Sequence, residues 1–568
     1  MMSQAMMQSA RGIIPSELVL KNAVVLNVFT KELLQQDVAI CKGTIVGVGT
    51  YEGLEEVDCT GKFIVPGWID AHLHIESSML LPSCFAQEIA PWGTTTVIAD
   101  PHEIGNVSGL DGIRFLISQS QNLPCNIYFM LPSCVPATPF DINGATLNAD
   151  SLEALKGEEH VLGLGEVMNY QGVVEGDPDL LEKLQLFADK PIDGHAPLLT
   201  GKDLQAYLLA GVMTDHECSA QEEAAEKLRN GMYLLAREGS AAKNLEEIIN
   251  AVFQNHLDFD RIAFCTDDRH IGSIRRQGHI SRHIKKAIRL GVDPITAYLC
   301  ASLHPAQIYG LKHLGAVAAG YQADLVVLDS LLETEISAVY HKGRPVQREA
   351  QPAPQIPHTL MNTVRLSKYS MDSLILPCGE GEYPVIEVIP RQINTRLLWE
   401  PLPHRDGIFT PNQTYCKAAV LERHHATPSI GLGVVKGFSL HGAAASTVAH
   451  DSHNLIVIGD NDADIFLAIK TLEQMQGGYA AVLEGQVMAA VPLPVCGLMS
   501  DQDGNLVEKQ TTAFIQAVRK MGMEEQHDPF QTLSFLSLPV IPEARLTHRG
   551  IFDSLRFEYL PFAPKAAE

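Results

Sequence analysis

Short apolar runs separated by turn residues occupy the first 66 positions of the chain. The runs are three to six residues long, rich in Val, Ile and Leu, and divided by Lys, Asn and Gly, which is typical of strands and tight turns. The strand candidates are residues 18–20, 23–28, 37–40, 44–48 and 63–65. We therefore predict that residues 1–66 form the N-terminal part of a small β-sandwich.

From residue 67 the pattern changes to apolar strands that alternate with helical stretches. This alternation is typical of a parallel β/α architecture. Eight strands are predicted, at residues 68–74, 94–100, 125–131, 161–167, 191–195, 211–216, 232–237 and 261–267. Eight such units in roughly 240 residues predict a (β/α)8 TIM barrel over residues 67–314.

Two helix starts between these strands carry recognisable capping patterns. Ser219 and Glu222 have the spacing of a capping box, which predicts a helix that runs to about Asn230. Asp293 followed by Pro294 predicts an N-cap with proline at the first helical position.

The β pattern returns after the barrel. Residues 323–329 and 336–340 read as strands, and we predict that the segment 315–350 rejoins residues 1–66 in one discontinuous sandwich. Residues 351–357 are proline-rich and predict a linker. The segment 351–568 is long enough for a further α/β domain, so the expected class is α/β throughout.

Metal-binding side chains stand at the carboxyl ends of several predicted barrel strands. His72 and His74 are two apart on one strand, so both imidazoles project to the same side. The other candidates end later strands: Glu166, His195, His216 and Asp267. Active sites of such barrels lie at this rim, and mixed imidazole and carboxylate ligands suit zinc, manganese or iron. We predict one metal centre built from all six residues.

The two carboxylates in this set have specific expected roles, and a third carboxylate lies next to one of them in the sequence. Glu166 has two oxygens and could bridge two metal ions. Asp267 could bind a metal and also take a proton from bound water. Asp268 is an alternative ligand, but strand alternation along 264–268 predicts that it faces the opposite way.

Composition and charge exclude several classes of function. The formal net charge of −25 argues against nucleic acid or an anionic membrane surface as a partner. Eleven scattered cysteines without a C-x-x-C pair are typical of free thiols in a reducing compartment. The methionine-rich start lacks a continuous apolar segment, and no run of 18 apolar residues occurs, so neither a signal peptide nor a membrane span is expected.

The ordered ligand set, with a split sandwich around the barrel, resembles the amidohydrolase superfamily. The sequence motifs around and beyond these ligands are similar to those of the bacterial adenine deaminase family within this superfamily. The motifs that carry this likeness are residues 66–78 (PGWIDAHLHIESS), 100–104 (DPHEI), 165–168 (GEVM), 193–197 (DGHAP), 214–217 (TDHE), 237–240 (REGS), 266–269 (TDDR), 446–454 (STVAHDSHN) and 545–549 (RLTHR). The resemblance therefore extends from about residue 18 to residue 549. In many binuclear members a carboxylated lysine stands on the fourth strand, where this chain has Glu166.

The resemblance implies an activity, a cofactor and further site residues. The expected reaction is hydrolysis of adenine, as a small-molecule substrate, to hypoxanthine and ammonia in cytoplasmic purine salvage. Two divalent metal ions are expected per chain, Mn²⁺ or Fe²⁺ by preference and Zn²⁺ as an alternative, with Glu166 bridging and Asp267 moving a proton. A homo-oligomer is expected. By analogy with other deaminases, Glu217 would protonate the purine ring. Substrate contacts are predicted for Glu103, Arg237 and Ser240.

Two alternatives stay open from the sequence. The scaffold could serve another hydrolase, such as an amidase, deacetylase or cyclic-amide hydrolase, because fold does not determine substrate. It could also be a non-catalytic scaffold, although all six predicted ligands are present. His450 and His453 could bind metal, but a polar loop that meets the mouth of the barrel is the preferred interpretation.

Overall fold

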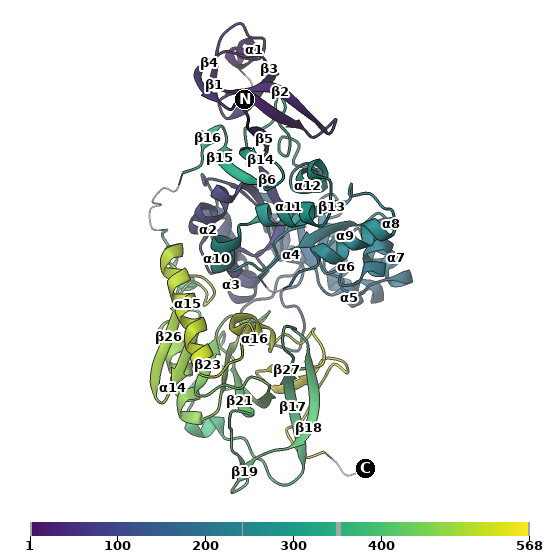
Figure 1. Cartoon of the computed structure of the whole chain (residues 1–568). Coiled ribbons are helices and arrows are strands. Elements are labelled where there is room, and N and C mark those ends of the chain that lie inside the picture. Colours follow the sequence, from purple (N-terminus) through teal and green to yellow (C-terminus); the bar gives the residue numbers. More distant parts are fainter. Residues whose placement is uncertain (1–2, 241, 348–353, 566–568) are drawn as a thin grey trace.

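The computed structural model describes residues 3–240, 242–347 and 354–565. Figure 1 shows an N-terminal sheet at one end, a barrel with surrounding helices in the middle and a C-terminal α/β part at the other end. Of the predicted linker 351–357, residues 351–353 lie outside the described residues.

The middle part is a parallel barrel, and its eight predicted strands all occur within the described residues. They are β6 (Trp68–Leu73), β7 (Thr94–Ala99), β8 (Asn126–Leu131), β9 (Val161–Val167), β10 (Ile192–Gly194), β11 (Thr214–Asp215), β12 (Tyr233–Arg237) and β13 (Ile262–Cys265). Neighbours in sequence are neighbours in space, from β6 to β10 and from β11 to β13. Met213 N donates to Ile192 O at 2.9 Å, and Leu73 forms a parallel bridge with Asp267, so the two sheets close on each other. The predicted α/β barrel is confirmed.

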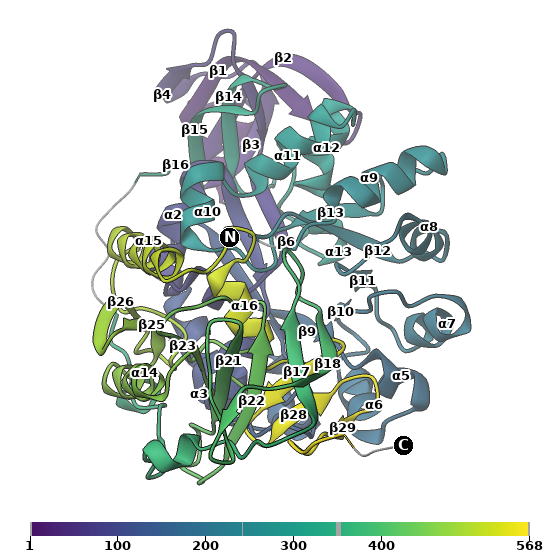
Figure 2. The same cartoon turned by 60° about the horizontal axis from the view of Figure 1, so that its bottom comes forward.

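Helices connect and cover the barrel strands, and Figure 2 shows α7, α8 and α9 outside β10 to β13. The helices are α2 (Pro82–Ile89), α3 (His102–Gln119), α4 (Ala149–Lys156), α5 (Tyr170–Glu175), α6 (Pro178–Leu186), α7 (Gly201–Leu209), α8 (Gln221–Arg229), α9 (Leu245–Gln254), α10 (Ile271–Gln277), α11 (Ile280–Arg289), α12 (Pro294–Cys300) and α13 (Leu303–Ile308). The strands between them are apolar because both of their faces are covered.

The two predicted helix starts have different outcomes. Asp293 caps α12 as predicted, since its side chain accepts from Thr296 N at 3.0 Å and Pro294 is the first helical residue. The capping box at Ser219 is wrong, because α8 begins at Gln221 after an N-cap at Ala220. Ser219 N instead donates to Glu223 Oε2 at 3.1 Å.

The N-terminal and returning segments build one eight-stranded sheet. Its strands are β1 (Ser16–Asn27), β2 (Glu32–Cys41), β3 (Thr44–Gly49), β4 (Gly53–Asp58), β5 (Phe63–Pro66), β14 (Leu325–Ser330), β15 (Glu335–His341) and β16 (Arg344–Pro345), and α1 (Gln4–Ala10) lies beside it. β5 pairs with β14 in antiparallel register, which joins segments about 260 residues apart. The two runs predicted at 18–20 and 23–28 are a single strand with an irregularity between Leu20 and Ala23.

The C-terminal part is a mixed sheet flanked by helices. Its order is β18-β17-β22-β21-β24-β23-β25-β26. The bounds are β17 (Glu382–Val388), β18 (Thr395–Pro401), β21 (Tyr415–Leu421), β22 (Ile430–Lys436), β23 (Ala443–Ser446), β24 (Leu455–Gly459), β25 (Gly478–Leu483) and β26 (Gln486–Pro492), with α14 (Asp462–Gln474), α15 (Gly504–Lys520) and α16 (Pro529–Phe535). Smaller pairs are β19 (His404–Arg405) with β20 (Ile408–Phe409), and β27 (Ala544–Thr547) with β28 (Gly550–Asp553) and β29 (Glu558–Tyr559).

The barrel and the C-terminal part share one hydrophobic core. A single cluster of buried side chains includes Phe85 and Leu131 from the barrel together with Val491 and Phe514 from the C-terminal part. Arg275 of α10 also bonds Glu88 of α2 and Glu508 of α15 at 2.8 Å each. Within the described residues, no helix is both long and apolar enough to cross a membrane.

Candidate metal centre at the carboxyl end of the barrel

The two histidines of the first barrel strand point at one cluster of side chains. His72 lies in β6 and His74 follows it directly, and both are buried. His74 Nδ1 lies 2.9 Å from the carbonyl oxygen of Asp100, which can only accept a hydrogen bond. In the neutral ring the proton is therefore on Nδ1, and Nε2 directs its lone pair into the cluster, as a metal ligand requires.

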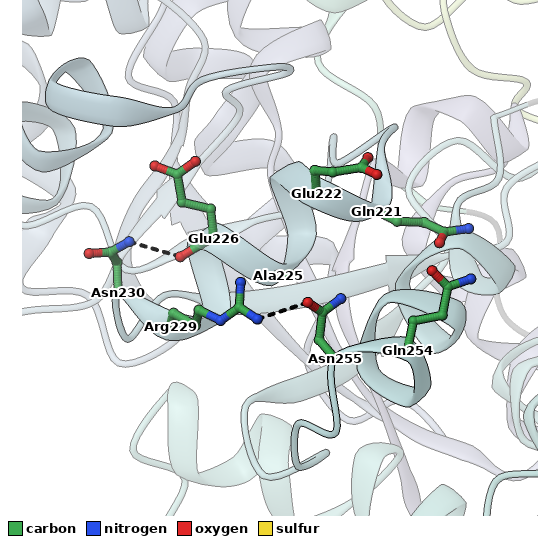
Figure 3. A pocket seen from close by; sticks show the side chains of 8 residues that line it. All are labelled: Gln221, Glu222, Ala225, Glu226, Arg229, Asn230, Gln254 and Asn255. Atoms are coloured by element: carbon green, nitrogen blue, oxygen red, sulfur yellow. Dashed lines mark hydrogen bonds between the residues drawn. The ribbon is translucent and has the colours of Figure 1, made fainter.

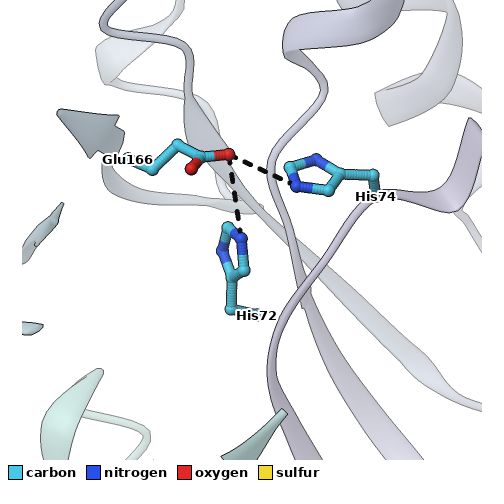
Figure 4. A group of neighbouring side chains, drawn as sticks. All are labelled: His72, His74 and Glu166. Carbon is cyan, nitrogen blue, oxygen red and sulfur yellow. Dashed lines mark ion pairs between the residues drawn. The ribbon is translucent and has the colours of Figure 1, made fainter. Parts of the chain in front are cut away.

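Glu166 is the junction of the cluster. Its Oε1 lies 3.8 Å from His72 Nε2 and 3.3 Å from His74 Nε2 (Figure 4). Its Oε2 lies 2.6 Å from His195 Nδ1 and 3.3 Å from His216 Nε2. Each oxygen thus faces its own pair of imidazoles, which is the arrangement of a carboxylate shared between two sites.

Asp100 and Gly165 hold Glu166 in this position. Asp100 Oδ2 accepts a hydrogen bond from Glu166 N at 2.9 Å, and Ser133 Oγ donates to Glu166 O at 2.6 Å. A Cβ at Gly165 would stand 2.1 Å from Asp100 Oδ2. Glycine therefore permits the close approach that anchors the Glu166 backbone.

Asp267 closes the cluster on the side of the first strand. Its Oδ1 lies 3.2 Å from His74 Nε2 and 3.9 Å from His72 Nε2. Its Oδ2 accepts a hydrogen bond from Arg237 Nη1, which also bonds Glu217. Arg237 Nη2 donates a further bond to Glu217 at 3.0 Å, so one guanidinium joins the two carboxylates predicted to be catalytic.

The predicted facing of Asp268 is wrong. β13 ends at Cys265 and Asp267 has φ of +56°, so strand alternation does not continue to residue 268. Asp268 lies with His74 and Asp267 in a group whose ligand atoms are within 4.8 Å of one another. Its Oδ1 also accepts a hydrogen bond from Ser77 Oγ.

Ser240 lies beside this cluster, but its hydroxyl forms hydrogen bonds with residues outside the cluster. Its Oγ accepts from His270 N at 2.9 Å and lies 3.0 Å from Ser273 Oγ. Its backbone N donates to Asp268 O at 2.8 Å. Substrate contact by Ser240 stays a prediction.

A buried lysine supports the strand ends that carry His195 and His216. Lys227 of α8 bonds Asp215 Oδ2 at 2.9 Å, Glu223 Oε1 at 2.6 Å and Ala196 O at 2.6 Å. Asp215 Oδ1 in turn accepts from Ala196 N at 2.9 Å. These bonds link the residues next to both histidines to one helix.

The electrostatics of the metal-free cluster favour charged carboxylates. Burial raises the pKa of Glu166, but hydrogen bonds from His195 and His216 outweigh it and hold the pKa well below its usual value. For Asp267, burial is likewise outweighed, first by the charge of Arg237, and the pKa is well below normal. Burial lowers the pKa of His216, yet its hydrogen bond to Glu166 raises it to about 9.

The donors present fit divalent metal ions. The described residues include the groups His72–His74–Glu166 and Glu166–His195–His216, whose ligand atoms are close enough to surround one ion each. His72 Nε2 is buried and finds no hydrogen-bond partner among the described residues. A buried imidazole nitrogen without a partner is costly, and a metal ion would satisfy it.

A second cluster lies next to the first and involves the C-terminal part. His102 Nδ1 is 3.4 Å from Glu166 Oε1, and His102 Nε2 is 3.4 Å from Glu103 Oε1. Glu103 contacts His450 Nδ1 at 2.7 Å and also bonds His453 Nε2. The predicted meeting of the 446–454 loop with the barrel mouth is therefore observed.

From the sequence, His102 is expected only as part of a strand-end segment that contacts substrate or supports the ligands, and Asp451 only as part of the polar loop 450–454. Asp451 is buried, and its Oδ2 finds no partner in the described part of the chain. Burial and the charge of Glu103 raise its pKa, against the opposing charge of His102. Asp451 is about 350 positions from the barrel residues it approaches, so no local pattern signals its place.

An open polar hollow on the outer helices is not part of this centre. It lies between α8 and α9, where Arg229 Nη2 donates to Asn255 Oδ1 at 2.8 Å (Figure 3). None of the predicted site residues lines it.

Comparisons with known proteins match both the barrel and the C-terminal part. The model of the Amidohydrolase family matches residues 63–349, and that of the Adenine deaminase C-terminal domain matches residues 392–558. A curated relative from Desulfitobacterium hafniense (strain Y51), named adenine deaminase, is 46% identical over 97% of both chains. A relative of the same name from Clostridium acetobutylicum is 43% identical over 97% of this chain and 99% of its own. A crystal structure of an adenine deaminase covers 58% of this chain and 99% of its own, with 16% identity and a TM-score of 0.45.

Proposed function

Because the chain belongs to the amidohydrolase family and to the adenine deaminases within it, we propose that it hydrolyses adenine to hypoxanthine and ammonia. One water is consumed for each amine released. The oxygen of water bonds to C6 of the purine, the C6–N bond breaks, and the amine leaves with the protons it needs to become ammonia.

The observation that carries this proposal is the division of Glu166 between two imidazole pairs. His72 and His74 face one oxygen, and His195 and His216 face the other. These four histidines, together with Glu166 and Asp267, would hold two divalent metal ions. Such ions lower the pKa of bound water from 15.7 to about 7, which supplies a nucleophile at neutral pH.

The chain's own residues would then orient the attacking water and move its protons. Asp267 accepts the proton of the attacking water on the oxygen that faces His74 and returns it towards the leaving amine. Glu217 protonates the purine ring after it has taken up a proton itself, since Arg237 keeps its carboxylate charged beforehand. The charge of Arg237 lowers the pKa of Glu217 even though burial opposes this change.

Further parts of the proposal rest on the family resemblance. We assign Glu103, Arg237 and Ser240 to substrate contacts, and Mn²⁺ or Fe²⁺ to the metal sites, with Zn²⁺ as an alternative. The proposed setting is purine salvage in the cytoplasm by a homo-oligomer.

The boundaries between the predicted domains, at residues 66, 314 and 350, also stay predictions.

The test is turnover of adenine by Mn(II)-loaded protein, with hypoxanthine and ammonia measured together. We expect the two products in equal amounts. His72→Ala and Asp267→Asn should abolish turnover, whereas His313→Ala, which changes an exposed histidine, should not affect it.

Three results would separate the alternatives. A full metal load without turnover would indicate a hydrolase with another substrate. Fewer than one metal per chain after reconstitution would favour a non-catalytic scaffold. Turnover that survives His72→Ala would place the reaction away from this centre.

A further inference from the structure

We propose that the C-terminal part completes the substrate site, because His450 and His453 hold the Glu103 carboxylate where it accepts a ring N–H of the purine. This inference rests on the proposed function and deepens it. It assigns positioning roles to the two histidines and a specificity role to Glu103.

The contacts between these three side chains are buried and direct. Glu103 is in the first turn of α3, whereas both histidines are in the loop between β23 and β24. His453 Nε2 bonds Glu103 Oε2, and His450 Nδ1 lies 2.7 Å from Glu103 Oε1. All three side chains are nine-tenths buried or nearly so, which strengthens their mutual electrostatic interactions.

The hydrogen bonding of His453 determines its role. Ala449 N donates to His453 Nδ1 at 3.2 Å, so this nitrogen is the acceptor of the ring. In the neutral tautomer the proton is then on Nε2, which donates it to Glu103. A nitrogen that carries a proton cannot bind a metal, so this cluster is a carboxylate clamp rather than a third metal site.

The loop that carries the histidines is fixed on both sides. Arg423 Nε donates to His453 O, and Asn454 Nδ2 donates across to Ile142 O of a barrel loop at 3.0 Å. His450 N donates to Ser534 O at 2.9 Å, and its ring stacks on Phe535 with centroids 4.7 Å apart. The clamp therefore depends on contacts that only the assembled chain provides.

Glu103 is one imidazole away from the metal centre. His102 lies between them, 3.4 Å from Glu103 Oε1 on one side and 3.4 Å from Glu166 Oε1 on the other. A purine whose reacting carbon lies at the metal centre would extend about as far as the separation between Glu166 and Glu103. Asp451 interacts electrostatically with His102 and Glu103, and its Oδ2 finds no hydrogen-bond partner in the described part of the chain, so a buried acceptor that a ligand N–H could satisfy belongs to the same group of side chains.

A clamped carboxylate selects for the free base. It can only accept hydrogen bonds: Oε2 is bonded by His453, and Oε1, although it pairs with His450, finds no hydrogen-bond partner among the described residues, so both oxygens keep lone pairs for a ligand. Adenine and hypoxanthine carry an N–H in the five-membered ring, which their 9-substituted derivatives and nucleosides lack. A site built to bond an N–H rejects an analogue without it strongly, because its buried acceptor is left unpaired.

The experiment measures binding of hypoxanthine and of 9-methylhypoxanthine to the Mn(II)-loaded full chain by calorimetry. His453→Leu removes the clamp donor, and we expect it to weaken hypoxanthine binding by about 10- to 100-fold while 9-methylhypoxanthine is unaffected. His453→Gln keeps an N–H donor and should restore most of the affinity. His441→Gln changes a half-exposed histidine paired with Asp460 and serves as the matched control.

Turnover and metal content complete the design. KM for adenine should rise in His453→Leu more than kcat falls, and Glu103→Gln combined with His453→Leu should cost no more than the larger single effect. All variants should retain the metal content of the wild type. A merely structural defect would instead weaken both ligands alike.

Several results would overturn the inference. One is an equal loss of affinity for hypoxanthine and 9-methylhypoxanthine in His453→Leu. Another is unchanged affinity for hypoxanthine in both His453→Leu and Glu103→Gln. The third is one metal ion fewer in His453→Leu than in the wild type. If the wild type does not turn over adenine but His453→Leu still loses affinity for hypoxanthine alone, the inference stands and the proposed function fails.

Discussion

At the scale of single residues, the centre depends on how closely Asp100 approaches the backbone of Glu166. The carboxylate that orients Glu166 is also next to the carbonyl that orients His74. Asp100, at the end of the second barrel strand, thus holds one imidazole of the first pair and the carboxylate that both pairs share. Ligand positions of this kind are usually sensitive to their supporting hydrogen bonds.

Gly165→Ala tests this support. Its new Cβ would meet Asp100 Oδ2 at 2.1 Å, so either the Asp100 carboxylate or the backbone that carries Glu166 must shift, and the hydrogen bond between them is disturbed. We expect metal affinity or kcat/KM to fall by about 10- to 100-fold, the usual cost of lost ligand support. Gly157→Ala is the control, since a Cβ there meets nothing within 4 Å. Equal metal affinity and activity in the two variants would contradict the role of Asp100.

Glu217→Gln tests the proposed acid at the same scale. The amide cannot transfer a proton, so kcat should fall by about 10²- to 10⁴-fold at unchanged metal content. Metal analysis and steady-state kinetics provide the measurement. Glu222→Gln, at an exposed position five residues later, should behave like the wild type. Near-normal turnover in Glu217→Gln would remove this residue from catalysis.

At the scale of elements, α8 acts on the centre through Lys227. The lysine is fully buried and bonds Asp215, which precedes His216. Burial alone would raise the pKa of Asp215, but the charges of Lys227 and His216 hold it below its usual value. A carboxyl group with a lowered folded-state pKa contributes stability above its unfolded pKa, and this contribution is lost as the pH falls.

Lys227→Met should therefore destabilise the metal-free chain in a pH-dependent way. Two buried carboxylates would lose their counter-charge, which usually costs about 3–5 kcal/mol. The cost should be largest near pH 7 and shrink towards pH 4, where Asp215 can take up a proton. Thermal unfolding at both pH values measures it, with the exposed Lys202→Met as control. A cost independent of pH would show that packing, not charge, is the contribution of Lys227.

The elements also show what the sequence could and could not predict. Buried parallel strands are continuous apolar runs, so all eight barrel strands were predictable, and with them the residues at their ends. β4 was missed because it is an exposed strand with Glu55 and Glu56 at its centre. The place of Asp268 was mispredicted because the left-handed φ of Asp267 interrupts the alternation. The clamp on Glu103 joins residues about 350 positions apart, and no local pattern encodes such a contact.

At the scale of the whole molecule, the barrel and the C-terminal part are bound by their common core. Phe85 and Val491 belong to one cluster, and Ser500 N donates to Met79 O at 2.9 Å across the same boundary. The candidate metal centre lies within the barrel, but the second cluster beside it joins His102 and Glu103 of the barrel to His450 and His453 of the C-terminal part. The two parts are therefore expected to unfold together.

Calorimetry with and without Mn(II) tests this cooperativity. A ligand that binds only the folded state raises its stability, by about 2.7 kcal/mol at a hundredfold excess over its Kd. We expect one main transition for barrel and C-terminal part, which moves upward as a unit when Mn(II) is added. Two transitions, of which only one responds to Mn(II), would contradict a shared folding unit.

The pairing of β5 with β14 has a consequence for how the chain folds while it is being synthesised. β5 is complete when residue 66 has been synthesised, but its partner strand begins at Leu325. At roughly 5–20 residues per second, the free edge of β5 waits on the order of tens of seconds for that partner. An exposed strand edge is a template for wrong pairing during this interval. Expression yield should therefore respond to translation speed between these two strands and to the supply of chaperones that cover nascent chains.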